Sequence, residues 1–442
     1  MAVRDGDAVD RSAHWSDREV DQGAFKDARL GRRFADILKQ LGDGMGGTIP
    51  FACQDWANTK AAYRFFSNAK VEEGDILSGH FAATRTRYDA CEGPILLLQD
   101  TTEFTYQRRH PRDIGFTKSV NSGRDKFRGT AALKRKINPT RVPIEQKESV
   151  RWLENLRQSI DRLGRPDRCI HVGDRESDIF ELYCLAKELG THFVVRTCVD
   201  RLAGDGSHTI SAEMSDVDAA GQHIIEVRDD AGEVVKVALD VRFKQIRVLP
   251  PIGKQKRYPS LDLTVIHAVE ANAPKGRKRI EWKLLTDLPV ESCAEAVEKI
   301  RWYAMRWKIE VFHKILKSGC RAEDAKLRTA DRLANLVSVF CIISWRVLWL
   351  TMLARTSPEA PPTVALTDTE IVLLDRLVSD AGNRKTPPGT LIFYLTKLAR
   401  LGGYLASAAD PPPGNTVVWR GLTRLTDIKL GAEIAGVQNV GN

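Results

Sequence analysis

Two aspartates at the ends of predicted strands are the first candidates for chemistry. Asp100 ends the apolar run ILLLQD, and Asp174 ends the run CIHVGD. Sites in open α/β sheets form outside the carboxyl ends of the strands, so both side chains could reach one site. Two carboxylates there could share hard divalent cations such as Mg²⁺ or Mn²⁺. The alternative, favoured for either aspartate taken alone, is that it caps a following turn.

A third carboxylate lies on a predicted helix with the sequence WYAMRWKIEVFHKILK. Helical spacing places five polar side chains on one stripe, namely Tyr303, Arg306, Glu310, Lys314 and Lys317. An adjacent apolar stripe contains Trp302, Met305, Ile309, Phe312 and Leu316. One face could therefore be buried while the other presents a carboxylate flanked by cations and a phenol. The alternative is a solvated charged face with i,i+4 ion pairs.

The elements that must position these residues can be read from hydrophobic periodicity. Residues 1–14 are polar and predicted to be disordered, and residues 15–90 are predicted to form a helical domain. Its expected helices cover 25–42, 55–68 and 71–86, with a turn at Gly46-Gly47 and Pro50.

The following region is predicted to be an α/β core with an insertion. The core comprises residues 91–204 and 291–356, with strands at 95–100, 169–174 and 192–198 and helices at 151–163 and 177–190. Residues 205–290 are predicted to be a mainly β insertion, with strands at 224–229, 234–249, 261–271 and 280–286. Helices are expected to return at 291–318, and a linker at 357–366 precedes a helical C-terminal unit, residues 367–442.

Composition narrows the class of protein. The chain has 442 residues and a net charge of +9, which fits an anionic partner such as nucleic acid but is weak evidence alone. Its eight cysteines are scattered without a C-x-x-C pair, which argues against structural zinc and a disulfide framework. The N-terminus shows no apolar signal region. Residues 333–354 are strongly apolar but include Arg346, so a buried core helix is favoured over a membrane span.

Three motifs together resemble a known family. The segments LLLQDTTEFTY and VGDRESDIFEL, with Y-x-x-R-x-x-x-E-x-x-x-x-x-x-K, are similar to the Y-R-E-K group of insertion-sequence DDE transposases, the IS-four and Tn-five-like family. The resemblance spans most of the chain. It implies a ribonuclease-H-like catalytic core in which Asp100, Asp174 and Glu310 hold two Mg²⁺ or Mn²⁺ ions. It also implies that Tyr303, Arg306 and Lys317 contact DNA phosphates.

The resemblance further implies a reaction and its partners. The reaction that the resemblance implies is cut-and-paste transposition. The metal site would cleave double-stranded DNA at inverted-repeat ends through a hairpin and join the freed end to target DNA. A homodimer would pair two ends, with residues 367–442 as the dimerisation region, in the bacterial cytoplasm at the nucleoid. Two further residues carry expectations. Trp282 matches the aromatic on which a flipped base stacks, although a core tryptophan on a strand is the alternative. Arg175 is a candidate phosphate contact, although an ion pair to Glu176 is the alternative.

Cations in two other regions are candidates for DNA contact. Arg29, Arg32 and Arg33, together with Tyr63 and Arg64, lie in the part that resembles the terminal-repeat-binding domain. Residues 1–70 contain 11 Lys/Arg against 10 Asp/Glu, so only the local cluster argues for DNA. Residues 108–141 hold 11 Lys/Arg and two Asp, which could equally be a basic solvated loop.

The sequence departs from the family pattern between the two aspartates. A ribonuclease-H-like core has sheet order 3-2-1-4-5, and an antiparallel hairpin there supplies strands two and three. Only 74 positions separate Asp100 from Asp174, and residues 107–150 show no two strand-like runs. We therefore expect an internal deletion, with its seam near Lys126-Phe127, that uncovers one edge of the first strand. Alternatives to an active transposase are a non-catalytic DNA-binding remnant that inhibits transposition, and a general nuclease.

Overall fold

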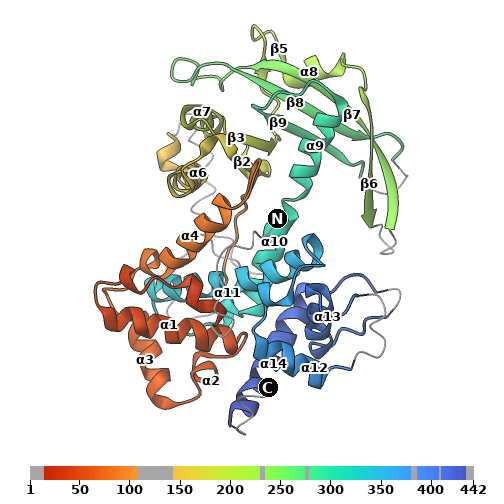
Figure 1. Ribbon diagram of the computed structural model, residues 1–442. Coiled ribbons are helices and arrows are strands. Elements are labelled where there is room, and N and C mark those ends of the chain that lie inside the picture. Colours follow the sequence, from red (N-terminus) through yellow and green to blue (C-terminus); the bar gives the residue numbers. More distant parts are fainter. Residues whose placement is uncertain are drawn as a thin grey trace, which may run out of the picture. The chain divides into compact units, whose positions relative to one another are not determined.

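The chain forms two compact units. The computed structural model describes residues 14–106, 143–228, 234–273, 278–379, 386–407 and 410–434 (Figure 1). The helical unit contains the described residues of Met1–Cys91, Thr102–Lys118 and Val311–Asn442. The sheet unit contains those of Glu92–Thr101 and Ser119–Glu310. Together they give a mixed α/β protein with a helical N-terminal part and one mixed sheet.

Short helices build the N-terminal part of the helical unit, as the sequence predicts. They are the 3-10 turns Trp15–Glu19 and Gln22–Ala24, and the helices α1 (Ala28–Asp43), α2 (Ile49–Cys53), α3 (Trp56–Phe66) and α4 (Glu73–Asp89). Polar side chains stand at their starts, and Asp27 caps α1 as Asp55 caps α3. Helix α2 was not predicted, because its five residues are too few to show a period. Thr48 caps α2 and Pro50 lies in its first turn, so the predicted turn is partly helical.

A long apolar helix forms the centre of the helical unit. Helix α11 spans Ala330–Thr356 and packs against α1, α3 and α4. By length and composition it could cross a membrane, but 67% of its most apolar window is buried inside the protein. Arg346 is buried on it and donates a hydrogen bond to the Ala365 carbonyl. These contacts agree with the prediction of a core helix for residues 333–354.

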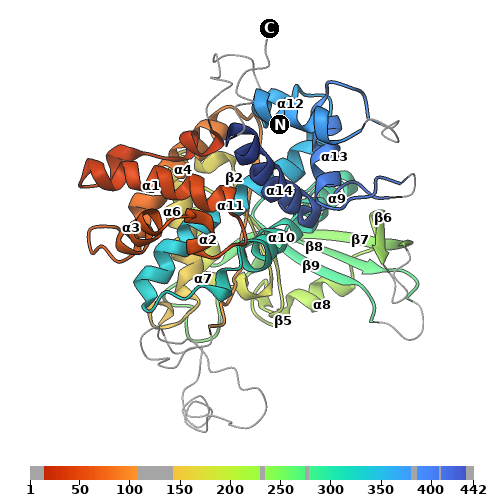
Figure 2. The same ribbon diagram turned by 90° about the horizontal axis from the view of Figure 1, so that it is seen from below.

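The C-terminal part of the helical unit is also helical. It contains α12 (Asp368–Leu377), α13 (Leu391–Leu401) and α14 (Asn415–Ile434), after the 3-10 turns Ala322–Asp324 and Pro362–Val364. Helices α13 and α14 lie side by side (Figures 1 and 2). Their close approach depends on two glycines: a Cβ at Gly421 would lie 2.0 Å from the Leu398 carbonyl oxygen, and one at Gly402 would lie 1.9 Å from that of Val417. Whether this part mediates dimerisation stays a prediction.

The sheet unit is built on three parallel strands followed by antiparallel ones. The order is β1-β2-β3-β9-β8-β7-β4-β5, and β6 pairs with β7. Strands β1 (Ile95–Leu98), β2 (Cys169–Gly173) and β3 (His192–Arg196) are parallel, and α6 (Val150–Leu163) and α7 (Phe180–Leu189) connect them. The predicted core strands and helices are therefore confirmed as elements.

The β-rich region continues the same sheet. It contributes β6 (Gly221–Arg228), β7 (Val234–Val248), β8 (Leu261–Glu270) and β9 (Glu281–Thr286), close to the predicted strands. Strand β9 pairs antiparallel with β3, so the insertion extends the core sheet. The two-residue strands β4 (Leu202–Ala203) and β5 (His208–Thr209) and the short helix α8 (Ile210–Ser215) were not predicted, because such short elements carry no periodic signal.

Strand β1 lies at the edge of the sheet among the described residues. It pairs only with β2 there, and all four of its residues are half-buried. The order β1-β2-β3 corresponds to strands 1-4-5 of the expected core. The predicted deletion, its seam at Lys126-Phe127 and the basic run 108–141 lie outside the described residues. So do residues 1–13 of the segment 1–14, for which disorder was predicted. The deletion therefore stays a prediction.

The division into two units places a boundary between Glu310 and Val311. This boundary lies inside residues 291–356, which we expected to belong with the core strands, and that domain assignment stays a prediction. Residues from Val311 onward cluster with the N-terminal helices instead. The reason is that α11 is apolar around most of its circumference and buries its side chains against other helices.

A buried carboxylate stabilises the helical unit. Glu19 is 3% exposed, and it accepts hydrogen bonds from His80 and from Arg87, at 2.5 and 2.8 Å. Arg87 also stacks 4.0 Å from the ring centre of Trp345 on α11. Burial alone would raise the pKa of Glu19, but the hydrogen bonds and charges of His80 and Arg87 lower it below its usual 4.5.

The lowered pKa predicts how this carboxylate contributes to stability. The contribution is present above the unfolded-state pKa and is lost as the pH falls through the folded-state pKa. We expect Glu19→Gln to cost about 1–3 kcal/mol at pH 7, and less at pH 4 and below. Thermal unfolding across this pH range measures the difference in stability between the wild type and Glu19→Gln, with the exposed Glu359→Gln as control. A difference that stays constant with pH would show that the charged form of Glu19 does not stabilise the fold.

Candidate active site

The β1–β2 register brings the two predicted aspartates to the same end of neighbouring strands. Leu98 pairs with Val172, and the Gln99 N–H donates to the Val172 carbonyl at 2.9 Å. Asp100 comes two positions after Leu98, and Asp174 comes two positions after Val172. Both therefore lie at the carboxyl edge of the sheet, where sites form in this type of fold.

Asp174 caps a local turn, as the alternative predicted, whereas Asp100 caps none in the described structure. Asp174 accepts a hydrogen bond from the Glu176 N–H at 2.8 Å, and Asp100 accepts one from the neighbouring Thr101 N–H at 2.9 Å. The Thr101 hydroxyl donates to the Glu176 carboxylate at 2.9 Å and ties the two segments together. Since each of these backbone contacts uses one carboxylate oxygen of the aspartate, the other oxygen remains for a further contact.

A buried polar pair supports the site from within the sheet. The Gln99 side chain contacts His171 Nδ1 at 2.8 Å, and both residues are almost fully buried. Burial lowers the pKa of His171 to about 4, so the imidazole is neutral at pH 7. This pair was not predicted, although Gln99 directly precedes Asp100 and His171 interrupts the apolar run three positions before Asp174.

The predicted helix that carries Glu310 is broken in the structure. Helix α9 (Cys293–Ala304) ends before a turn at Met305-Arg306, and α10 (Trp307–Lys314) begins after it, followed by a π-helical turn over Ile315–Gly319. The expected single stripe from Tyr303 to Lys317 is therefore wrong. Neither glycine nor proline marks the break, and nothing in the local sequence explains it.

Arg306 connects two of the three predicted carboxylates. Its Nη1 lies 3.2 Å from Asp100 Oδ2, and its Nη2 donates to Glu310 Oε1 at 2.5 Å. Burial alone would lower the pKa of Arg306, but the hydrogen bond that it donates to Glu310 and the charge of Asp100 raise it. The contact with Glu310 is an i,i+4 ion pair, as expected for a solvated charged helix face. The contact with Asp100 is not explained by such a face, because Asp100 follows a distant strand.

The three carboxylates do not form a closed metal site here. Within the described parts of the chain, no three Asp, Glu, His or Cys side chains lie close enough together to hold a metal ion. Asp100 and Asp174 end adjacent strands, and Asp100 shares a guanidinium with Glu310. The donor set is the oxygen-rich one that Mg²⁺ and Mn²⁺ prefer. Metal binding by these residues stays a prediction.

Tyr303 and Trp282 face the core of the sheet unit. Helix α9 packs against β7, β3, β8 and β2 of the sheet. Ala296, Ile300 and Tyr303 on this helix belong to the buried cluster that these strands form. Tyr303 is 7% exposed and meets Trp282 edge to face, with 5.7 Å between ring centres. Trp282 is half-buried, which agrees with a core tryptophan on a strand. The predicted DNA contact of Tyr303 would require its buried phenol to become accessible.

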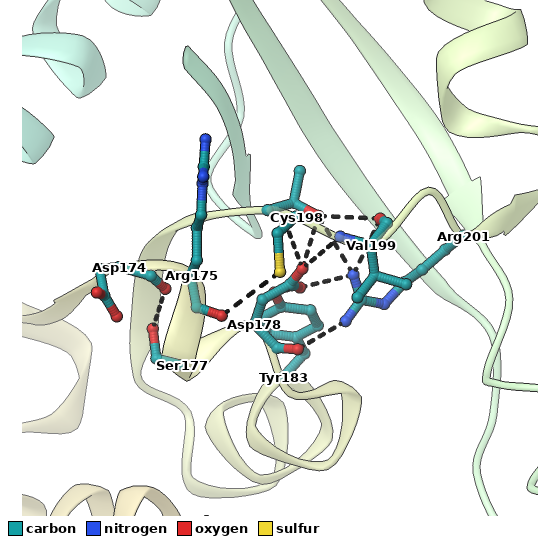
Figure 3. A network of polar contacts seen from close by, with 9 residues as sticks. Asp174, Arg175, Ser177, Asp178, Tyr183, Cys198, Val199 and Arg201 are labelled. Atoms are coloured by element: carbon teal, nitrogen blue, oxygen red, sulfur yellow. Dashed lines mark hydrogen bonds and ion pairs between the residues drawn. The ribbon is translucent and has the colours of Figure 1, made fainter. Parts of the chain in front are cut away.

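A buried network fixes the chain that follows Asp174 (Figure 3). Asp178 accepts hydrogen bonds from Tyr183, from Thr197 and from the N–H groups of Cys198 and Val199. Arg201 pairs with it at 2.6 Å, and both side chains are at most 5% exposed. The network joins the turn after β2 to the loop after β3. The network was not predicted, although Asp178 belongs to the motif VGDRESDIFEL.

Arg175 projects away from this network. Its side chain is exposed, while its carbonyl accepts a contact from the Cys198 thiol at 3.7 Å (Figure 3). It forms no ion pair with Glu176 in the described structure, so the alternative interpretation is not supported. An unpaired arginine beside Asp174 is available for a phosphate.

The two predicted lysines belong to the helical unit. Lys314 is exposed. Lys317 is half-buried, donates to the Glu103 carbonyl and lies 5.6 Å from the ring centre of Phe104. Its ammonium is therefore already held by the chain that follows β1.

The N-terminal helices present cations and aromatic rings to solvent. Arg29 and Arg32 on α1 are exposed, whereas Arg33 is half-buried and donates to Asn58. On α3 the exposed side chains include Trp56, Lys60, Tyr63 and Arg64, whose spacing places them on one face. Aromatic rings interleaved with cations are suited to contact nucleic acid.

This part of the chain matches a known family. Residues 12–71 match the family model described as "Transposase DNA-binding". The match supports a transposase role with DNA as the partner. It covers the helices that carry Arg29, Arg32, Arg33 and Tyr63. It does not extend to the sheet unit, so catalysis and the three carboxylates are taken up below as a proposal.

The buried network generates a stability prediction. Asp178→Ala would leave Arg201 buried without its carboxylate, at a cost of about 3–5 kcal/mol. Hydrogen exchange followed by mass spectrometry should show faster exchange across residues 174–201. The exposed Glu188→Gln on α7 serves as control. Unchanged exchange in the Asp178 variant would show that the network does not hold this region.

The exposed arginines generate a binding prediction. If Arg29 and Arg32 contact phosphates, replacing either with Gln should weaken DNA binding and reduce the slope of log K against log salt by about one. Titration of labelled duplex DNA at several salt concentrations measures both quantities. Arg420→Gln, which removes an exposed charge from α14, should leave the slope unchanged. If the slope of log K against log salt were the same for the wild type and all variants, Arg29 and Arg32 on α1 would not contact DNA phosphates.

Proposed function

We propose that this chain is a metal-dependent DDE transposase of the Y-R-E-K group. Its N-terminal helices would recognise the inverted-repeat ends of a mobile element, and its sheet unit would cleave and join DNA. The observation that carries the proposal is the convergence of Asp100 with Asp174, through strand register, and with Glu310, through Arg306. The family match at residues 12–71 supports the coarser part of the proposal, a transposase role with DNA as the partner.

The proposed site assigns a task to each residue. Asp100, Asp174 and Glu310 would hold two Mg²⁺ or Mn²⁺ ions, which when bound supply charge stabilisation at the reacting phosphate. Arg175 and Arg306 would contact DNA phosphates near the cut, and charge-assisted hydrogen bonds from their guanidinium groups suit that task. Lys314 and Lys317 would contribute further positive charge along the DNA.

The finer steps follow the family's cut-and-paste route. A hairpin at the element end requires a sharply bent strand and an extruded base, and Trp282 is the proposed stacking partner. Because Trp282 and Tyr303 pack together, stacking would need the tryptophan ring to turn out of this contact. The proposed assembly is a homodimer that pairs two ends through the C-terminal helices, and the proposed location is the bacterial nucleoid.

One observation favours a second candidate function. Three carboxylates close enough for a metal ion are not found among the described residues, and β1 is an edge strand there. A non-catalytic protein that binds ends, or that sequesters active copies, would need the helical unit but no metal site.

A cleavage assay separates the two functions. The substrate is a supercoiled plasmid that carries the element's own ends, incubated with and without Mg²⁺. We expect Mg²⁺-dependent nicking at the ends, reduced at least about a hundredfold in Asp100→Asn and Glu310→Gln. The control is Glu188→Gln, an exposed carboxylate on α7. Binding of the ends without any cleavage would contradict the catalytic proposal and support the inhibitor.

A further inference from the structure

Arg306 occupies the place between two carboxylates of the proposed metal site. Its side chain is 16% exposed and that of Asp100 is 17% exposed, whereas Glu310 is 56% exposed. One guanidinium thus neutralises two acidic groups that lie 210 positions apart in the sequence. A cation is needed there, because two carboxylates near each other repel when neither is paired.

The contact with Asp100 depends on charge more than on a directed bond. Arg306 Nη1 lies 3.2 Å from Asp100 Oδ2, yet this nitrogen is buried without a hydrogen-bond partner of good geometry in the described structure. A buried donor without a well-aligned acceptor costs free energy. The guanidinium is therefore less well satisfied here than a ligand built for this place would be.

Arg306 makes both carboxylate contacts with the end of its flexible side chain. It lies in the turn between α9 and α10. The guanidinium can move away from Asp100 by rotation about the side-chain bonds, because the backbone hydrogen bonds of the turn do not involve it. Asp100 and Glu310 are anchored independently, the first after β1 and the second on α10.

We infer that Arg306 is a latch that holds Asp100 and Glu310 in the metal-free protein and is displaced when a divalent cation binds. The inference rests on the proposed metal site. It accounts for the absence of a closed three-carboxylate cluster in the described structure, since the guanidinium stands between two of the three groups. Arg306 is in this role a positioning residue.

Displacement would also link the metal to DNA. Once released from the carboxylates, the Arg306 guanidinium has both Nη groups free to contact a phosphate. Metal binding and DNA binding would then favour each other, because each stabilises the state in which the latch is open.

Metal affinity tests the latch without reference to activity. Free Mn²⁺ is measured by electron paramagnetic resonance during titration of the full chain and of three variants. Arg306→Gln removes the competing guanidinium. Arg301→Gln removes an exposed charge from α9 and controls for the general loss of positive charge. Asp100→Asn removes a proposed ligand.

The latch predicts that Arg306→Gln binds Mn²⁺ about two- to tenfold more tightly than both the wild type and Arg301→Gln, since two partly exposed ion pairs no longer compete. Equal or weaker affinity in Arg306→Gln, with binding lost in Asp100→Asn, would overturn the latch and leave the metal site standing. Unchanged affinity in Asp100→Asn would overturn the metal site itself, and the latch with it.

Discussion

The parallel pairing of β1 with β2 is the constraint on which the candidate site depends. It places Asp100 and Asp174 at one edge of the sheet, although 74 positions separate them. A slip by one residue would turn the side chains of β1 to the opposite faces of the sheet. The Gln99–His171 pair and the Thr101–Glu176 hydrogen bond fix this register on either side of the aspartates.

The β-rich insertion has a direct part in positioning the third carboxylate. Because β9 pairs with β3, the insertion and the core strands form one continuous sheet. Helix α9 lies on that sheet and buries Ile300 and Tyr303 against it. The turn after α9 then brings Arg306 to Asp100. The insertion therefore anchors the helix that leads to Glu310, and this structural role is separate from any contact that it makes with DNA.

The sequence predicts the fold where its pattern is long and periodic. The apolar runs before Asp100 and Asp174, the helices α1, α3 and α4, and the strands of the insertion are confirmed as elements. Short elements such as α2, β4 and β5 escape prediction because they complete no period. The break at Met305-Arg306 escapes it because the residues there are good helix formers, and tertiary packing overrides local preference. The Asp178 network joins segments that only the folded chain brings together.

The central claim is that three acidic side chains, distant in the sequence, belong to one metal-binding site. Fe²⁺ in place of Mg²⁺ would test it directly, because radicals that form at the bound iron in the presence of ascorbate cut the polypeptide nearby. The account predicts cuts next to Asp100, Asp174 and Glu310, all of them lost in Asp174→Asn. Cuts near the two aspartates without any near Glu310, or cuts that Asp174→Asn leaves unchanged, would contradict it.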